Sequence, residues 1–467
     1  MERPESVFRL GEAARWLRCA VDPRHAGLRI RRVVTDSRGD CRDALFVGIR
    51  GERFDGGAFA EEAFRRGALA AVLEKPRAAR ARGPVLRVAD ARVALAVLAR
   101  CRLERMRAKV VAVTGSCGKT TTREMTRLML AGRYRVHAAP ESFNNDIGVP
   151  LTLLSAPRGT EVMLVEFGTN SRGEISLLCK IAPPHVAVIT QIAPAHIGRL
   201  GSMTAIWEEK CDVMRGARAH ATGVLNVAAW RHQEVPPPPG GGLLRTGLTA
   251  AADLRAEIVG LDGARLRFRV GGHEGALVPP ARHLVECALC ALGVAETLGV
   301  ERGEALEALS KFVPPKMRLR PKLLDGILVV NDAYNANPAS VKAAARFLAD
   351  LPVRGRRVMV LGEMRELGGY SEELHREVGA FVAECVDTLI CVGAAAAAAG
   401  AEAQRRGATV FVRDDPEEAG VFLSGMLRPG DAVLLKASRA MRLERTAALL
   451  EKARPRRRRK GKNMRTA

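Results

Sequence analysis

Residues 109–132 (KVVAVTGSCGKTTTREMTRLMLAG) pass from an apolar run through a short glycine loop into a helix-forming segment. The apolar run is typical of a buried parallel strand, and residues 119–132 carry the spacing and end signals of a helix. A helix that follows such a loop directs backbone N–H groups and the positive end of its dipole at an anion. The stretch therefore predicts a phosphate site at the edge of a parallel α/β sheet.

The glycine loop is shorter than the common phosphate-binding form G-x-x-x-x-G-K-[ST]. Gly118, Lys119 and Thr120 match the end of that form, but its first glycine falls at Gly115, and Val113 stands where the longer loop has glycine. In such loops the lysine reaches the terminal phosphates, and the threonine hydroxyl holds Mg²⁺. We expect a short nucleotide-binding loop, the alternative being an incidental glycine turn. The loop residues expected to bind ATP are Gly115, Ser116, Cys117, Gly118, Lys119, Thr120 and Thr121.

The 467 residues suggest two to four domains, and three blocks are visible. Short apolar runs with turn signals fill residues 1–88, whereas strand and helix patterns alternate in residues 89–314 and again in residues 315–451. We predict a three-domain α/β protein: a small α/β N-terminal domain, a central parallel-sheet domain that carries the phosphate loop, and a C-terminal Rossmann-like α/β domain. Within the last two domains we expect a small antiparallel region at residues 252–278 and a helix that starts at Pro338.

The net charge of +23 favours anionic partners such as nucleotides, nucleic acids or anionic membranes. Nine of the 74 Lys and Arg residues lie in residues 452–467, which contain no acid, so the rest of the chain carries +14. We expect this tail to be a disordered, solvated segment. Contact of the tail with nucleic acid or lipid is the less favoured alternative.

The ten cysteines suggest no disulfide framework, so a reducing cytoplasm is expected. The one C-x-x-C pair, Cys287 and Cys290, shares a predicted helix with His283. A buried apolar helix face is favoured over a metal site, because no further C-x-x-C pair completes a ligand set. No apolar run reaches the 18 or so residues that span a membrane, and the charged first residues lack a signal-peptide core.

The loop pattern T-G-x-x-G-K-T-T resembles that of the Mur ligase and folylpolyglutamate synthase superfamily of ATP-dependent amide ligases, whose muramyl members have three domains. Further segments resemble one muramyl group in the same order along the chain, from about residue 30 to residue 450. These segments are TDSRGDCRDALFVGIRGERFDGGAF (residues 35–59), ESFNNDIGVPLTLL (residues 141–154), VEFGTNSRGEI, AHIGRLGSMTAIWEEK, NDAYNANPAS and LGEMRELGGYSEELHREVG.

The resemblance implies a ligase that makes UDP-N-acetylmuramoyl-pentapeptide for peptidoglycan synthesis. ATP would phosphorylate the terminal carboxylate of UDP-N-acetylmuramoyl-tripeptide, and the amine of D-alanyl-D-alanine would displace the phosphate. The runner-up enzymes are a muramyl ligase that adds the third residue, which NNDIGVP and YNANP disfavour, and a folylpolyglutamate synthase, which the TDSR block disfavours. A nucleic-acid-binding ATPase and an inactive scaffold are the alternatives from other classes.

Four residues are expected to perform the chemistry with Lys119. Glu166 ends a predicted strand, where ligands of open α/β sheets cluster, and its carboxylate suits Mg²⁺ beside Thr120. From the residues alone, His196 is interpreted as a structural histidine and Lys210 as a solvated lysine. The resemblance instead implies that His196 and a CO₂-carbamylated Lys210 hold a second Mg²⁺, and that Arg318 contacts ATP phosphate.

The resemblance also assigns residues to the substrates. Asn335, Asn337 and Pro338 would flank the adenine and ribose of ATP. Ser37 and Arg38 would contact the UDP part, and Asn144 and Asn145 would face the muramyl peptide. His375, Lys436, Ser438 and Arg439 fall in motifs that would help to receive the dipeptide.

Three positions depart from the family pattern, namely Asn331, Glu363 and Ala437, where an acid, Asp and Gly are common. These mild changes affect fine contacts rather than the reaction class. Because the ATP loop and Arg318 fall in different predicted domains, closure around the substrates is expected before chemistry. The family also leads us to expect a monomer.

Overall fold

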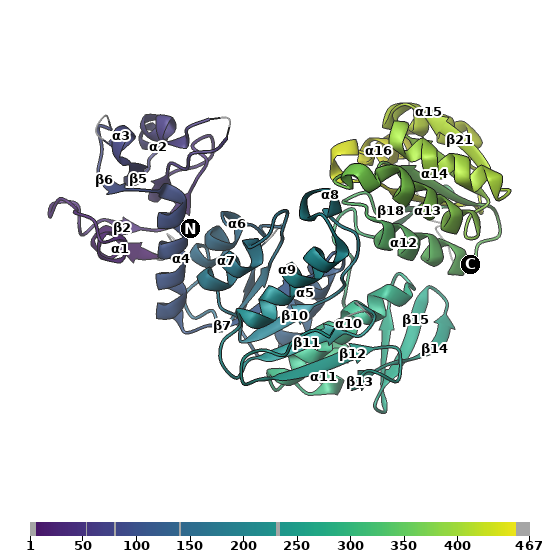
Figure 1. Cartoon of the computed structure of the whole chain (residues 1–467), viewed down its shortest axis with the longest axis horizontal. Coiled ribbons are helices and arrows are strands. Elements are labelled where there is room, and N and C mark those ends of the chain that lie inside the picture. Colours follow the sequence, from purple (N-terminus) through teal and green to yellow (C-terminus); the bar gives the residue numbers. More distant parts are fainter. Residues whose placement is uncertain (1–5, 53, 79–80, 140–141, 230–233, 454–467) are drawn as a thin grey trace, which may run out of the picture.

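The computed structural model describes residues 6–453 except residues 53, 79–80, 140–141 and 230–233. The chain forms three α/β bodies that follow one another along the sequence (Figure 1). The predicted fold class is confirmed, whereas the boundaries given above stay predictions. Residues 454–467 of the predicted disordered tail lie outside the described residues.

The N-terminal body is built on a four-stranded parallel sheet in the order β3-β4-β5-β6, beside the antiparallel pair β1-β2. β4 is fully buried and β5 nearly so, as expected for strands covered on both faces. The strands are β1 (Phe8–Arg9), β2 (Arg29–Ile30), β3 (Arg32–Val34), β4 (Ala44–Val47), β5 (Ala70–Glu74) and β6 (Val85–Val88). The helices are α1 (Leu10–Leu17), η1 (Gly56–Phe59), α2 (Ala60–Arg65) and α3 (Lys75–Ala78).

Helix α4 (Ala91–Met106) joins the N-terminal body to the central one (Figure 1). Its start is fixed by Asp90, whose side chain accepts hydrogen bonds from the backbone N–H groups of Arg92 and Val93. Such an N-cap satisfies donors that a helix end otherwise leaves unpaired. Because α4 packs on α1 of the first body and on α6 of the second, it serves both cores.

The central body holds a seven-stranded sheet in the order β13-β12-β11-β10-β7-β9-β8, and every pairing in it is parallel. The predicted strands β7, β9, β10 and β11 are confirmed, while the short or glycine-flanked strands β8 and β12 were not foreseen. β13 falls in the region predicted to be antiparallel, but it pairs in parallel with β12 and so belongs to this sheet. The strands are β7 (Lys109–Thr114), β8 (Val136–Ala138), β9 (Val162–Glu166), β10 (Val186–Ile189), β11 (Thr222–Asn226), β12 (Gly242–Gly247) and β13 (Leu254–Arg255). The helices are α5 (Lys119–Leu130), α6 (Gly148–Leu154), α7 (Glu174–Ile181), α8 (Ile197–Leu200) and α9 (Met203–Arg215).

The predicted antiparallel region is confirmed as a three-stranded sheet in the order β14-β15-β16. Two helices then return to the central sheet, and the first of them packs against α5, the helix that follows the phosphate loop. These elements are β14 (Glu257–Asp262), β15 (Arg265–Val270), β16 (His273–Leu277), α10 (Arg282–Thr297) and α11 (Arg302–Leu309).

The C-terminal body has a six-stranded sheet in the order β17-β18-β22-β19-β20-β21, parallel except for the β17-β18 hairpin. The helix predicted to start at Pro338 does so, with Asn337 as its N-cap. The strands are β17 (Arg320–Leu324), β18 (Ile327–Asn331), β19 (Arg357–Gly362), β20 (Thr388–Val392), β21 (Thr409–Arg413) and β22 (Ala432–Lys436). The helices are α12 (Pro338–Asp350), η2 (Gly368–Tyr370), α13 (Ser371–Ala383), α14 (Ala394–Arg405), α15 (Pro416–Met426), η3 (Arg439–Met441) and α16 (Glu444–Ala453).

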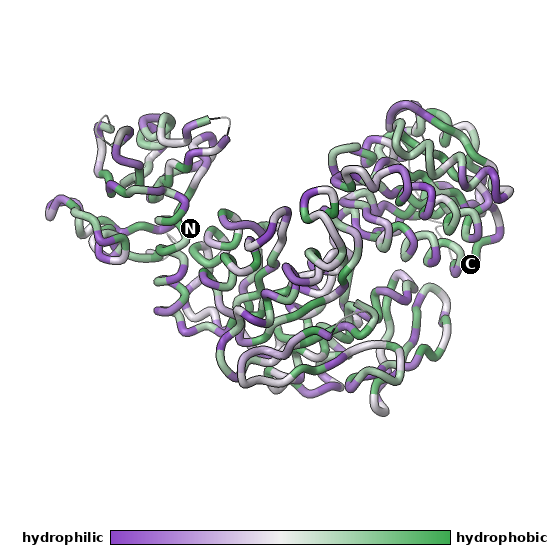
Figure 2. The backbone as a smooth tube through the Cα atoms, in the orientation of Figure 1, coloured by the Kyte–Doolittle hydropathy of each residue, from purple (hydrophilic) through white to green (hydrophobic). Residues whose placement is uncertain are grey.

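Hydropathy follows this layering, with apolar stretches along the inner strands and polar stretches on outward loops and helices (Figure 2). The strand β7 shows the pattern at its clearest, because Val110 to Val113 are fully buried. A strand buried on both faces reads as a continuous apolar run, which is why the sequence revealed it. The loop that leaves β7 is therefore anchored in the middle of the largest sheet.

The phosphate loop approaches the neighbouring strand β10 so closely that its first position admits glycine alone. Gly115 has φ 146°, a conformation that other residues rarely adopt. A Cβ atom added there would lie 2.1 Å from Oγ1 of Thr190, which follows β10. The short loop is therefore wedged between its own strand and the next one.

We expect Gly115→Ala to lower the midpoint of thermal unfolding, because overpacking alone destabilises by about 1–3 kcal/mol. Gly425→Ala is the matched control, since Gly425 lies inside α15 with open space around its Cα. Alanine there stabilises a helix by roughly 0.5–1 kcal/mol. Equal unfolding midpoints for Gly115→Ala and the unaltered chain, measured by calorimetry, would contradict this packing.

Candidate active site

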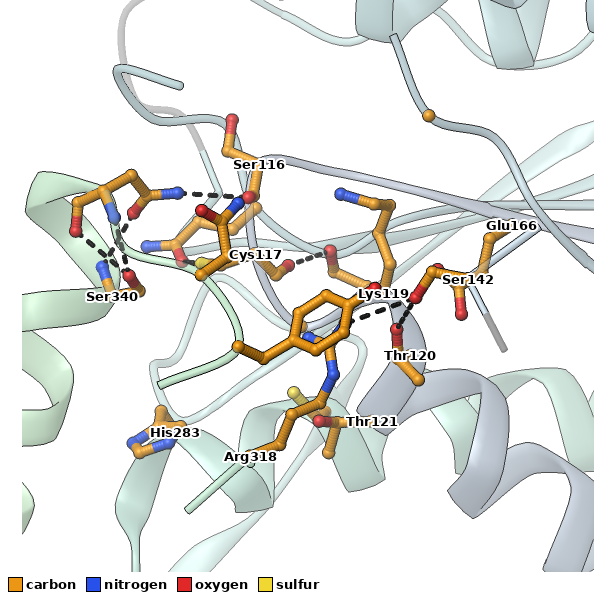
Figure 3. Close-up of a pocket in the computed structure, with 18 of the residues that line it drawn as sticks. Ser116, Cys117, Lys119, Thr120, Thr121, Ser142, Glu166, His283, Arg318 and Ser340 are labelled. Atoms are coloured by element: carbon orange, nitrogen blue, oxygen red, sulfur yellow. Dashed lines mark hydrogen bonds between the residues drawn. The ribbon is translucent and has the colours of Figure 1, made fainter. Parts of the chain in front are cut away.

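One cavity lies where the central and C-terminal bodies face each other, at the carboxyl ends of β7, β9, β10 and β11. Figure 3 shows its phosphate-loop side, with residues of α5 and of the C-terminal body turned toward one another. Ligands of open α/β sheets bind at this edge of the strands. The predicted site residues that line it are Ser116, Cys117, Gly118, Lys119, Thr120, Thr121, Asn144, Asn145, Glu166, His196, Lys210, Arg318, Asn335, Asn337 and Lys436. Gly115 and Pro338 are not among the lining residues; the first shapes the loop backbone and the second starts α12.

Hydrogen bonds from two segments hold the loop in shape. The backbone N–H of Ser116 donates to the carbonyl of Gln191 over 2.6 Å, and the Thr190 hydroxyl donates to the carbonyl of Cys117 over 2.5 Å. From the C-terminal body, Nδ2 of Asn337 donates to the carbonyl of Ser116 over 3.1 Å. These bonds constrain the backbone of the loop.

Lys119 folds back over the loop, where its Nζ donates to the carbonyl of Gly115 over 2.7 Å. Burial lowers the pKa of Lys119, Glu166 opposes that effect, and Arg318 adds to it. An ammonium group in this position is available to an anion that enters the loop.

Glu166 is a carboxylate nearly enclosed in protein. An Arg123 Nη1 atom lies 3.0 Å from its Oε1, and the two side chains are 3% and 2% exposed. The contact is an ion pair rather than an aligned hydrogen bond, because neither oxygen of Glu166 has a hydrogen-bond partner among the described residues. Orphaned buried oxygens of this kind are suited to a hard cation.

Thr120 and Glu166 together fit a Mg²⁺ ion. The Thr120 hydroxyl lies 3.4 Å from the hydroxyl of Ser142, so it is weakly engaged, and both residues face the same cavity as the Glu166 carboxylate. Hydroxyl and carboxylate oxygens are the ligands that Mg²⁺ prefers, completed by phosphate oxygens and water. The donor set therefore suits the cation expected at this loop.

Lys210 reaches the same cavity from α9 as a buried amine. Its Nζ donates to the Thr114 hydroxyl over 3.4 Å, and the described part of the chain gives it no ion-pair partner. Burial lowers the pKa of Lys210 well below its usual value, and the nearby Lys119 lowers it further. The solvated lysine that the bare sequence suggests is therefore wrong, and a neutral, nucleophilic amine is what this position favours.

His196 stands at the contact between the central and C-terminal bodies. It precedes α8 with φ 58°, and its Nδ1 makes a close polar contact with the carboxylate of Glu366, just before η2. This contact lowers the pKa of Glu366. Next to it, the N–H of Gly198 donates to the carbonyl of Glu366 over 3.1 Å. His196 therefore also links the two bodies.

Arg318 and the segment that follows β18 form the opposite wall. The guanidinium carbon of Arg318 lies 4.1 Å from the centroid of the Tyr334 ring, and its Nη2 donates to Ser142 over 3.5 Å. Lys436 pairs with Asp332 over 2.8 Å and donates to the carbonyl of Asn335 over 2.8 Å. These contacts hold a cationic wall opposite the phosphate loop.

The two asparagines expected to face the muramyl peptide differ in how far their side chains are already bonded within the fold. The side-chain oxygen of Asn145 accepts the N–H of Gly148 over 2.8 Å at the start of α6, so this residue is partly committed to the fold. Asn144 packs against Gly168, where an added Cβ would lie 2.7 Å from its side chain. Both line the cavity on the β9 side.

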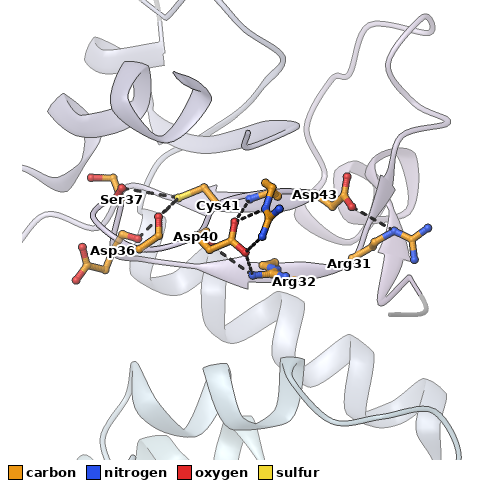
Figure 4. Close-up of polar contacts among 9 residues, drawn as sticks. Arg31, Arg32, Asp36, Ser37, Asp40, Cys41 and Asp43 are labelled. Atoms are coloured by element: carbon orange, nitrogen blue, oxygen red, sulfur yellow. Dashed lines mark hydrogen bonds and ion pairs between the residues drawn. The ribbon is translucent and has the colours of Figure 1, made fainter. Parts of the chain in front are cut away.

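Ser37 and Arg38 do not line this cavity, because they belong to a loop of the N-terminal body. The loop curls around the buried thiol of Cys41, which contacts three backbone carbonyls of the loop (Figure 4). Arg38 is exposed and pairs with Asp36 over 2.7 Å, a contact that lowers the pKa of Asp36 to about 2. A UDP group at this loop would lie at the far end of an extended substrate.

All four residues expected to help receive the dipeptide have contacts within the C-terminal body, and those of Lys436 are given above. His375 is fully buried, and its Nε2 accepts the N–H of Met364 over 3.1 Å. Ser438 accepts the N–H of Arg365, and Arg439 pairs with Glu444. Lys436 alone of this group lines the cavity.

Sequence reasoning missed several residues of the site. Arg123 lies four residues after Lys119 on α5, a spacing that places both on one helix face and was the available signal. Thr190 and Gln191 end a predicted strand, which is the same signal that identified Glu166. Glu366 and Ser142 carry no local pattern that marks them.

Helix α10 confirms the buried face predicted around Cys287 and Cys290, which are 8% and 0% exposed. Cys290 lies 3.4 Å from the Thr246 hydroxyl, and a Cβ on Gly118 would lie 3.1 Å from the Cys287 sulfur. All ten cysteines are free. In the described part of the chain, no helix is long and apolar enough to cross a membrane.

Comparison with known proteins agrees with this architecture. Three family models match in order: the Mur ligase family catalytic domain at residues 29–102, the Mur ligase middle domain at residues 113–295, and the Mur ligase glutamate ligase domain at residues 317–439. The chain belongs to the Mur ligase family.

Individual relatives of the chain within this family carry the name of one kind of Mur ligase. The UDP-N-acetylmuramoyl-tripeptide–D-alanyl-D-alanine ligase of Bacillus subtilis is 34% identical over 434 residues, which cover 91% of this chain and 93% of the relative. The crystal structure of MurF from Acinetobacter baumannii superposes with a TM-score of 0.85 at 28% identity, covering 96% of this chain and 100% of that one. MurF ligase from Thermotoga maritima in complex with ADP superposes with a TM-score of 0.80 at 29% identity, covering 91% and 98%.

We expect Arg123→Met to destabilise the central body by about 3–5 kcal/mol, because it leaves the Glu166 carboxylate buried without its cation. The double variant Arg123→Met, Glu166→Gln recovers part of that loss, since the uncompensated charge is removed. Arg127→Met is the control, because Arg127 pairs with Glu124 at the surface, where such pairs contribute about 0–1 kcal/mol. Urea unfolding measures all three, and equal losses for the two single variants would contradict the assignment.

Proposed function

We propose that the chain is an ATP-dependent, ADP-forming ligase that joins D-alanyl-D-alanine to UDP-N-acetylmuramoyl-tripeptide and so supplies the pentapeptide precursor of peptidoglycan. The observation that carries this proposal is the single cavity in which the short phosphate loop, the orphaned Glu166 carboxylate and the Arg318 wall converge. The names of the relatives point to the same reaction.

In the first step one anion attacks another. The carboxylate of the tripeptide attacks the γ-phosphate of ATP, the bond from the γ-phosphorus to its bridging oxygen breaks, and ADP leaves. Like unit charges about 4 Å apart repel by about 1 kcal/mol in water and about 4 kcal/mol at an effective dielectric constant near 20. Lys119 and Arg318 supply positive charge from opposite walls, and Arg318 does so with a planar group suited to phosphate oxygens. Thr120 and Glu166 would hold a Mg²⁺ ion, which when bound neutralises phosphate charge.

The second step releases phosphate from the acyl phosphate. The free amine of D-alanyl-D-alanine attacks the activated carbonyl, the C–O bond to phosphate breaks, the amine proton is lost, and an amide forms. Asn144 and Asn145 lie beside Glu166 at the β9 side of the cavity, where they would orient the muramyl peptide. Ser37 and Arg38 would contact the UDP part in the N-terminal body.

A second Mg²⁺ would be held by His196 and by Lys210 in carbamylated form. A neutral Lys210 amine adds to CO₂ and loses a proton, which turns a base into a carboxylate that bears negative charge. The buried position without an ion-pair partner among the described residues, together with the lowered pKa, supports this modification. The close contact of His196 with Glu366 would then have to loosen when the metal binds.

We place the reaction in the cytoplasm, where ATP and reduced thiols are found, in keeping with the ten free cysteines. A monomer suffices, because both walls of the cavity come from one chain. Neither a nucleic acid nor a lipid is needed for the reaction, so we assign the basic tail no part in it.

Phosphate release from ATP should require Mg²⁺, UDP-N-acetylmuramoyl-tripeptide and D-alanyl-D-alanine together, with a pentapeptide product detected by mass. Lys119→Ala should lower kcat by about 10²- to 10³-fold, the effect of losing one group that stabilises developing charge. Lys180→Ala, at an exposed position on α7, is the matched control and should leave kcat unchanged.

Omission experiments separate the alternatives. Release with UDP-N-acetylmuramoyl-dipeptide and a single amino acid, but not with the tripeptide and D-alanyl-D-alanine, would indicate a ligase that adds the third residue. Release stimulated by DNA or RNA, and lost when the chain is cut after Glu451, would indicate a nucleic-acid-binding ATPase. Either result would overturn the proposed reaction.

Carbamylation of Lys210 should give a carbamate carbon signal in NMR spectra of protein equilibrated with ¹³C-bicarbonate. The signal should be absent from Lys210→Ala, which should also lose ligase activity because a carboxylate ligand is missing. Lys342→Ala, with its lysine paired to Glu377 at the surface, should keep both. Full activity of Lys210→Ala would rule out the modification.

A further inference from the structure

The cavity has an end that the chemistry above does not use, and the strand order locates it. Reading across the sheet, β11 is followed by β10, β7 and β9. Glu166 ends β9, on one side of the phosphate loop, and Asn226 ends β11, two strands away on the other side. At about 4.8 Å per strand, that end of the cavity lies roughly 10 Å from the loop.

Glu166 and Asn144, which would hold Mg²⁺ and orient the muramyl peptide, lie on the β9 side of the loop. A nucleotide whose phosphates lie in the loop therefore directs its base toward the β11 side. This assignment rests on the proposed use of ATP. The lining of the cavity also includes Leu284, Phe312 and Pro314, which supply the apolar surface that a base needs.

Helix α10 supplies the polar groups at this end. His283, Glu286, Cys287 and Cys290 recur at intervals of three and four residues, so they share one face of the helix, and all four line the cavity. Figure 3 labels His283 of this face among the residues that line the same pocket as the phosphate loop. The C-x-x-C motif is therefore part of the cavity wall beside the loop.

Glu286 is the unusual member of this face. Its Oε2 accepts one long hydrogen bond, 3.4 Å from Nδ2 of Asn226, and no ion pair joins it to any of the described residues. Burial raises its pKa. His283 offers no compensating charge, because burial lowers its pKa to about 4. Lys436, whose charge also lowers the pKa of His283, is paired with Asp332.

A carboxylate left without a cation in a cavity needs a hydrogen-bond donor, and an ionised carboxylate only accepts. Adenine presents an amino group at position 6, whereas guanine and hypoxanthine present a carbonyl oxygen there. We infer that Glu286 accepts a hydrogen bond from the 6-amino group of the base and selects adenine nucleotides against 6-oxopurine nucleotides.

The test is nucleotide binding by the full-length chain with Mg²⁺, measured by calorimetry with ATP, ITP and GTP. The unaltered chain should prefer ATP over ITP by about 10- to 100-fold in Kd, the range for a hydrogen bond to a charged group. Glu286→Gln should reduce that preference at least about 10-fold, because its amide can donate to the 6-oxygen. Glu286→Ala should weaken ATP binding without a gain for ITP.

Glu296→Gln is the matched control, because Glu296 lies on the same helix, pairs with Arg302 and does not line the cavity. It should bind nucleotides like the unaltered chain. An unchanged preference in Glu286→Gln would overturn the inference, as would equal or tighter binding of ITP or GTP by the unaltered chain. Absence of binding to every nucleotide would instead overturn the proposed ATP site, whereas ATP binding without amide formation would overturn the proposed reaction alone.

Discussion

The site depends on the close approach between the phosphate loop and the strand beside it. Gly115 has no side chain, so the loop backbone lies directly against Thr190, and the Thr190 hydroxyl and the Gln191 carbonyl bond the next two residues. A longer loop would have room to adapt, whereas this one is fixed by β10. Glu166 and Asn226 end strands of the same buried parallel sheet, so the sheet also fixes their positions relative to the loop.

The C-terminal body completes the site instead of only covering it. Arg318, Lys436 and Asn337 come from three separate segments of that body, and each faces the loop or the cavity. The central body contributes the acids and the buried amine of Lys210. Both bodies therefore contribute charged groups to the cavity. An anionic substrate bound between them offsets the repulsion among the cations of one wall and also attracts the opposite wall.

The sequence predicted the elements whose signals are local. A continuous apolar run identified β7, and Pro338 with Asn337 before it marked the start of α12. Strand β17 was missed because Pro321 is typical of an edge or a loop, and β17 is indeed an edge strand. The bond from Asn337 to Ser116 joins residues 221 positions apart, and the Arg123–Glu166 pair joins a helix to a strand. Such contacts arise from packing, so a single sequence does not reveal them.

The Asn337 side chain has both of its ends engaged, since its oxygen caps α12 and its amide holds the Ser116 carbonyl. A rotation of the C-terminal body therefore cannot leave the phosphate loop unaffected, because it removes a bond from the loop backbone. The geometry of the loop and the angle between the two bodies are therefore thermodynamically coupled. A ligand that stabilises one loop geometry shifts the interdomain angle by the same coupling free energy. One side chain of this chain therefore joins the backbone of the phosphate loop to the first turn of α12.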